Sequence, residues 1–117
     1  MLAFISNCFG QEVTVSGIAT DSNNGAFAIE IVVNDVLAKL TGDDPKDVRA
    51  KYLKLCNDPR IVVRTDSTGV FTIKARETDS LFFKSYGHIK EAHLVRDLIK
   101  REKILIRLQP ETNPQTD

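Results

Sequence analysis

Short runs of alternating apolar and polar residues recur along this chain and predict β-strands. The run at residues 70–75 places its apolar side chains on one face, and these are Phe71, Ile73 and Ala75. A second run rich in β-branched residues lies at residues 61–64, and Asp-Ser-Thr-Gly at residues 66–69 separates the two runs. This cluster favours a tight turn, because aspartate and serine form local hydrogen bonds and glycine accepts a positive φ. We therefore predict a β-hairpin over residues 61–75.

Five further segments also predict strands, namely residues 12–20, 26–33, 80–86, 88–95 and 103–108. Their alternation predicts which apolar side chains share a face: Val13 with Val15, then Phe27 with Ile29, Ile31 and Val33, and the inward-facing Ile104, Ile106 and Leu108. In residues 80–86, Leu81 and Phe83 point one way and Phe82, Lys84 and Tyr86 the other, so we expect apolar groups on both faces of this strand. Asn24-Gly25 is the strongest local turn signal. The pattern predicts a mainly β protein in which seven short antiparallel strands form a two-sheet sandwich.

The spacing of apolar residues becomes helical between residues 35 and 58. Val48, Tyr52 and Leu55 recur at i, i+4 and i+7, which predicts one apolar stripe on a helix. Asp44, followed by proline, is a favourable helix start, because its carboxylate can accept from free amides and proline has no N–H to lose. We predict a helical insertion between strands two and three that lies over an edge or open end of the sheet.

Basic residues surround the apolar stripe of this insertion, and they are Lys46, Arg49, Lys51 and Lys54. Such a helix can cover a sheet edge and so block edge-to-edge aggregation. It can also present a basic face to another protein. We favour the cover, and the four basic residues are the candidate partner-binding residues under the second interpretation.

Composition restricts the class of protein and of partner. A chain of 117 residues, 42% hydrophobic, is long enough for one core and too short for two. Sixteen basic and sixteen acidic side chains cancel, so the broad positive surface expected of a nucleic-acid-binding protein is missing. We expect no nucleic-acid partner and no membrane span.

The two ends differ from the domain that we expect over residues 11–110. Residues 1–10 begin apolar and then turn small and polar, as in the end of a secretory signal peptide and its cleavage zone, although no basic region precedes them. We interpret them as a signal-peptide remnant; an ordinary first strand and lipid attachment at Cys8 are the alternatives. Residues 111–117 have no apolar anchor and predict a disordered tail.

Few residues suggest a metal site or a nucleophile. His88, Glu91 and His93 could supply metal ligands, but residues three apart on a continuous strand project to opposite faces. A three-ligand zinc site would need a bend at Gly87 or a bulge to re-aim them. We interpret Cys56 as a small half-buried hydrophobe rather than a reactive thiol.

Two polar turns carry oxygen atoms that suit calcium, at residues 21–25 and 66–69. Neither has the distal glutamate of a calcium loop, so both are interpreted as turns. No G-x-S-x-G nucleophile elbow occurs. We expect no catalytic residues, no metal and no cofactor.

Three motifs resemble those of a known family. Val-Ser-Gly-Ile-Ala-Thr-Asp at residues 15–21 is similar to its V-x-G-x-V-x-D strand, and residues 64–73 are similar to its T-D-x-x-G-x-F-x-I hairpin. Residues 79–88 resemble its D-x-L-x-F-S-x-x-G-Y strand, with His88 in place of tyrosine. On these motifs the chain resembles the carboxypeptidase-like regulatory domain, a transthyretin-like sandwich of Gram-negative cell-envelope proteins.

The resemblance implies a non-catalytic, exported module of the periplasm or cell envelope that binds another envelope protein or has a structural role. The insertion at residues 35–57 departs from the family, whose members usually run almost directly from strand two to the hairpin. The alternative function is a small metal-dependent hydrolase that uses His88, Glu91 and His93. The Tyr-Arg-Gly-Ser ending of transthyretin-like hydroxyisourate hydrolases is absent from this sequence.

Overall fold

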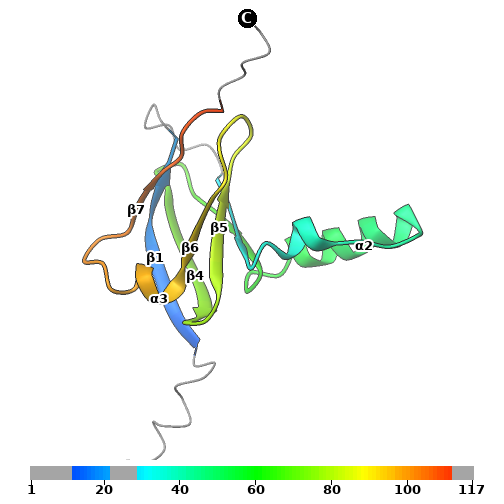
Figure 1. Ribbon diagram of the computed structural model, residues 1–117, viewed down its shortest axis with the longest axis horizontal. Helices are drawn as coiled ribbons and strands as arrows, with labels where there is room; N and C mark the ends of the chain where they lie inside the picture. Colours follow the sequence, from blue (N-terminus) through cyan, green and yellow to red (C-terminus); the bar gives the residue numbers. More distant parts are fainter. Residues whose placement is uncertain (1–11, 22–28, 112–117) are drawn as a thin grey trace, which may run out of the picture.

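The computed structural model describes residues 12–21 and 29–111 of the chain (Figure 1). Several sequence-based predictions fall outside these residues and stay predictions. They are the signal-peptide remnant with Cys8, the turn at Asn24-Gly25, the inward position of Phe27 and the tail beyond Glu111.

Two sheets form a sandwich-like fold. The first sheet has the strand order β4-β1-β7, with bounds Val70–Arg76, Glu12–Thr20 and Leu105–Arg107. The second has the order β3-β2-β5-β6, with bounds Val62–Arg64, Glu30–Val33, Ser80–Lys84 and Glu91–Leu94. The mainly β class and the two sheets are confirmed, and the described part of the chain contains seven strands.

The prediction of a hairpin over residues 61–75 is wrong. β3 pairs with β2 and β4 pairs with β1, so the two runs belong to different sheets. Thr65 continues the path of β3, because its N–H donates to the carbonyl of Ile29 at 3.1 Å. The turn after Thr65 therefore carries the chain from one sheet to the other. Alternation identifies the buried face of each run but not the strand with which it pairs.

An entirely antiparallel arrangement is also wrong. β7 runs parallel to β1, with Ile18 opposite Leu105 and Thr20 opposite Arg107. The short helix α3 (Val95–Leu98) and residues 99–104 connect β6 of the second sheet to β7 of the first. Parallel strands cannot be joined by a tight turn, and here all the other described strands lie between β1 and β7 along the chain.

The core lies between the sheets and contains most of the side chains that alternation predicted. Eight apolar residues that alternation places on a common face of β2, β5 or β7, or beside these strands, are buried, and they are Ile29, Ile31, Val33, Leu81, Phe83, Ile104, Ile106 and Leu108. Val15 is buried and Val13 is half-buried. Helix α3 adds Val95 and Leu98, both fully buried, from the segment between the last two predicted strands.

The insertion contains the 3-10 helix η1 (Val36–Lys39) and the helix α2 (Pro45–Cys56). The predicted helix start is confirmed, because the Asp44 carboxylate accepts from the N–H of Lys46 at 2.9 Å. α2 extends away from the sandwich (Figure 1), and none of its residues is buried. The prediction that it lies over a sheet edge is therefore wrong. One apolar residue per turn makes too narrow a stripe to hold a helix against a sheet.

Only the C-terminal end of α2 packs against the sandwich. Val32 and Val62, on the outer face of the second sheet, form a small apolar cluster with Leu37, and Leu55 and Cys56 of α2 pack against it. Within the residues that the structure describes, no helix combines the length and the apolar character needed to cross a bilayer.

Candidate functional site

The projecting helix α2 carries the predicted partner-binding residues, and all four are exposed: Lys46, Arg49, Lys51 and Lys54. Asp47 is the only acidic residue within the helix bounds, so α2 has an excess of positive charge. Two large apolar side chains lie exposed among these cations, with exposed fractions of 41% for Tyr52 and 48% for Leu53. The helix thus combines cations and apolar groups on a surface that the described sandwich does not cover.

The C-terminal turn of α2 is the part fixed to the sheet. Leu55 and Cys56 pack on Val32 and Val62, and a hydrogen bond with the Cys56 thiol raises the pKa of the Tyr52 hydroxyl. Cys56 is half-buried, as predicted from the sequence. The contact leaves the other turns of α2 accessible.

Two residues with left-handed backbone conformation form the start of the insertion. Asn34 has φ 53° and Asp35 has φ 52°. The Asn34 side chain donates to Asp79 Oδ1 at 3.0 Å and accepts from the N–H of Ser80 at 2.9 Å. These bonds hold the end of β2 against the start of β5.

Asp35 is buried and pairs with two lysines of the second sheet region. Lys90 Nζ lies 2.7 Å from Asp35 Oδ2, and Lys84 Nζ contacts Asp35 Oδ1. Burial raises the pKa of this carboxyl, but the hydrogen bonds from Lys84 and Lys90 outweigh burial and hold the pKa below its ordinary value. The ion pairs and the Asn34 bonds together fix the direction in which the chain leaves the sheet toward α2.

The structure separates the three residues of the alternative metal site. His93 Nε2 lies 3.0 Å from Glu91 Oε1 on the edge strand β6. The His88 ring instead hydrogen-bonds through Nδ1 to the carbonyl of Tyr86 at 2.9 Å. Among residues 12–21 and 29–111, no three histidine, cysteine, aspartate or glutamate side chains are grouped to hold a metal ion.

The polar turn at residues 66–69 uses its own oxygen atoms. One Asp66 oxygen accepts from the hydroxyl of Thr68 at 2.6 Å, from the N–H of Thr68 at 2.8 Å and from the N–H of Val70 at 3.0 Å. The Thr68 hydroxyl and these amides lower the pKa of the Asp66 carboxyl. This carboxylate stabilises the turn, in agreement with the sequence-based interpretation. Of residues 21–25, the structure describes only Asp21, which is buried.

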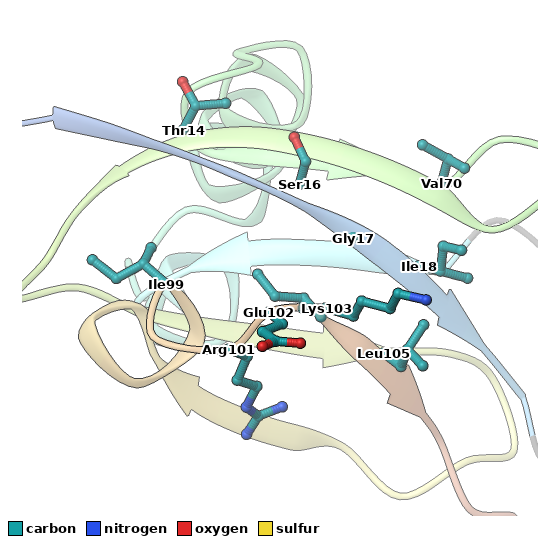
Figure 2. A pocket seen from close by; sticks show the side chains of 11 residues that line it. Thr14, Ser16, Gly17, Ile18, Val70, Ile99, Arg101, Glu102, Lys103 and Leu105 are labelled. Carbon is teal, nitrogen blue, oxygen red and sulfur yellow. The ribbon is translucent and has the colours of Figure 1, made fainter.

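An open hollow of about 670 Å³ on the first sheet was not predicted from the sequence. It lies between β1 and residues 99–105 (Figure 2), with Thr14, Ser16 and Ile18 on the β1 side and Ile99 and Leu105 on the other. No local signal could identify it, because it depends on where β7 begins to pair with β1.

Comparison with protein-family models, curated proteins and solved structures found no match to this chain. The function proposed below therefore depends on the geometry of α2 and on the motifs in the sequence. α2 carries all four of the basic residues that the sequence suggested for partner binding.

Proposed function

We propose that this chain is a non-catalytic interaction module of the cell envelope, exported to the periplasm, with a transthyretin-like sandwich as its scaffold. In this proposal α2 is the element that binds another envelope protein. One observation carries the proposal: α2 projects from the sandwich without burying any of its residues. A twelve-residue helix of which only the last turn packs on the sandwich is marginally stable in water, so binding to a partner would stabilise it.

The chemistry of α2 indicates the surface that it would bind. Lys46, Arg49, Lys51 and Lys54 suit an acidic surface, and Tyr52 and Leu53 suit an apolar centre within that surface. A helix laid into an apolar groove with a charged rim is a common mode of recognition. Twelve residues span about 18 Å, so we expect an interface at the small and reversible end of the usual range.

The alternative function needs His88, Glu91 and His93 around one ion. The described residues bring together only Glu91 and His93, and His88 is hydrogen-bonded to the backbone of Tyr86. Nothing in this geometry favours a metal-dependent hydrolase over an interaction module.

Site-specific photo-crosslinking in the native cells tests the role of α2. We expect a photoreactive residue at Leu53 to give a discrete crosslinked species, because this side chain is exposed on α2 and Lys54 is next to it in the sequence. The same residue at Thr72, exposed on the outer face of β4, is the control and should not give that species. Identical products from both positions would contradict the proposal.

Charge reversal provides a second arm of the same experiment. Changing Lys46, Arg49, Lys51 and Lys54 to glutamate should abolish the crosslink from Leu53 while leaving the circular dichroism of the sheets unchanged. The matched control reverses four exposed cations elsewhere, namely Lys74, Arg76, Arg96 and Lys100. Loss of the crosslink in both variants would indicate a general charge effect and would count against a specific α2 interface.

Export is tested separately by mass spectrometry of the periplasmic fraction. We expect the protein in this fraction with a processed N-terminus. Cytoplasmic protein that retains Met1 would count against export and would leave the crosslinking result to decide the role of α2.

A further inference from the structure

The N-terminal half of β1 has one edge with which no strand of the described residues pairs, and we call it the free edge. β1 pairs with β4 from Glu12 to Ile18, but it pairs with β7 only from Ile18 to Thr20. β7 therefore covers the C-terminal end of β1 and leaves the other half open on that side.

The hydrogen bonds show which backbone groups lie on this free edge. The N–H of Ile18 donates to the carbonyl of Ile104 at 2.9 Å, so Ile18 directs its backbone groups toward β7. Because alternate residues of a strand direct these groups to the same side, Ser16 and Thr14 direct theirs there too. The close contact between Ser16 Oγ and Thr72 Oγ1, 3.0 Å, agrees with this, since it is typical of a pair without mutual backbone bonds. No described residue bonds to the edge-facing backbone groups of Thr14 and Ser16.

The hollow lies along this free edge and has apolar walls. Four of the nine exposed large apolar side chains among the described residues line it, and they are Ile18, Val70, Ile99 and Leu105. Figure 2 shows Ile99 toward one end of the hollow and Ile18 with Leu105 toward the other. Free backbone groups and an apolar lining thus occur together at one place.

We propose that this hollow binds an extended segment of another protein, which adds as a strand beside residues Thr14 and Ser16 of β1. Backbone hydrogen bonds would supply the pairing, and alternate apolar side chains of the segment would contact Ile18, Ile99 and Leu105. This mode of binding, strand addition to a sheet edge, requires both features that the hollow offers. The site is distinct from α2 and extends the proposed function to a second partner.

Size and charge favour a short segment over a second copy of the chain. A hollow of about 670 Å³ is within the usual range for ligand sites, and residues 99–105 form its wall opposite β1, so the space beside β1 is bounded on both sides (Figure 2). Arg101 and Lys103 outnumber Glu102 on the lining. We therefore expect the segment to carry acidic residues beside its apolar ones.

A synthetic peptide provides the test: acetyl-Asp-Val-Thr-Val-Thr-Val-Asp-amide, titrated into the full chain labelled with ¹⁵N. We expect the amide signals of Thr14 and Ser16 to shift and to become protected from hydrogen exchange. A peptide of the same pattern with lysine in place of aspartate should bind more weakly. N-methylation of one alternate set of peptide amides should abolish binding and N-methylation of the other set should not, because only alternate N–H groups face β1.

Two proline variants give a matched pair. Ser16 and Thr72 are opposite each other in β1 and β4, and neither directs its N–H toward the other strand, so proline at either position removes no bond of that ladder. Both variants also lose the same hydroxyl contact. Ser16→Pro should weaken peptide binding at least about tenfold, and Thr72→Pro should leave it within about twofold.

Three outcomes would overturn the inference. The first is an unchanged spectrum at millimolar peptide. The second is a loss of binding in Thr72→Pro but not in Ser16→Pro, which would assign the peptide to the free edge of β4. The third is a dimer in sedimentation experiments that Ser16→Pro dissociates and the peptide does not, which would make a second copy the occupant.

Discussion

The rings of Phe71 and Phe83 meet edge to face across the sandwich, with centroids 5.5 Å apart and planes inclined by 73°. Phe71 belongs to β4 of the first sheet and Phe83 to β5 of the second. Both are buried. An aromatic pair of this geometry contributes more than the burial of its area alone, so the contact is a central link between the two sheets.

Phe83→Ala should destabilise the fold by about 3–5 kcal/mol, because it leaves a cavity between the sheets and removes the partner of Phe71. Equilibrium unfolding in urea measures the change. The matched control is Phe82→Ala, the same substitution at the neighbouring, half-buried position on the other face of β5. Equal losses for the two variants would contradict the assignment of Phe83 to the core.

Gly17→Ala should detach β7 from β1. A Cβ at this position would lie 2.6 Å from the carbonyl oxygen of Ile104 and 2.7 Å from its Cβ, and the backbone there cannot move without breaking the Ile18–Ile104 hydrogen bond. We expect a loss of about 1–3 kcal/mol and faster hydrogen exchange at Ile18. In the control Gly42→Ala, the new Cβ would meet one methyl group of the partly exposed Val48, at 2.9 Å, and no backbone atom within 4 Å, so a loss as large as that of Gly17→Ala would refute this explanation.

Asp35 makes stability depend on pH on the acid side. Its pKa in the folded state lies below the ordinary value of 3.8, since Lys84 and Lys90 outweigh the effect of burial. The unfolded chain therefore binds a proton more readily, and the stabilisation is complete above pH 3.8 and is lost as pH falls through the folded pKa. Asp35→Asn should cost about 1–3 kcal/mol at neutral pH and less below pH 3.8.

The measurement is the urea midpoint of both proteins between pH 7 and pH 2.5. Asparagine keeps the left-handed backbone at this position at little cost, so the comparison reports the charge. A constant difference between the two midpoints over the whole range would show that the ion pairs with Lys84 and Lys90 do not contribute.

Zinc should not bind stoichiometrically at β6. Glu91 and His93 provide two ligands, and a stable zinc site needs three or four. Elemental analysis of protein purified from zinc-replete cells measures the content. Stoichiometric zinc that is lost in both His93→Ala and His88→Ala would contradict this expectation. It would support the metal-dependent hydrolase that uses His88, Glu91 and His93.

The sequence predicts the buried faces of the strands well, because side-chain alternation is a local property. Phe71, Ile73, Leu81 and Phe83 lie where the period places them. The start of α2 was also predictable, since the Asp44 cap acts within one turn.

Pairing between strands was not predictable, because it depends on contacts between distant residues. The turn at Asp66 forms as expected, yet the strands on either side of it join different sheets. The path of residues 99–104 determines where β7 begins to pair with β1 and therefore where the hollow beside Ser16 lies. The ion pairs of Asp35 at the start of the insertion likewise join residues that are far apart in sequence, Lys84 and Lys90.

The left-handed pair Asn34 and Asp35 fixes the path of the chain where the insertion leaves β2. Asn34 is held by hydrogen bonds to Asp79 and Ser80, and Asp35 by its ion pair with Lys90. A rotation of either residue would break its own set of bonds. The base of α2 lies on the second sheet, whereas the hollow opens on the first. A partner bound to α2 and a strand bound beside β1 would therefore lie on opposite sides of the sandwich. The fold would then set the distance and the relative orientation of the two partners.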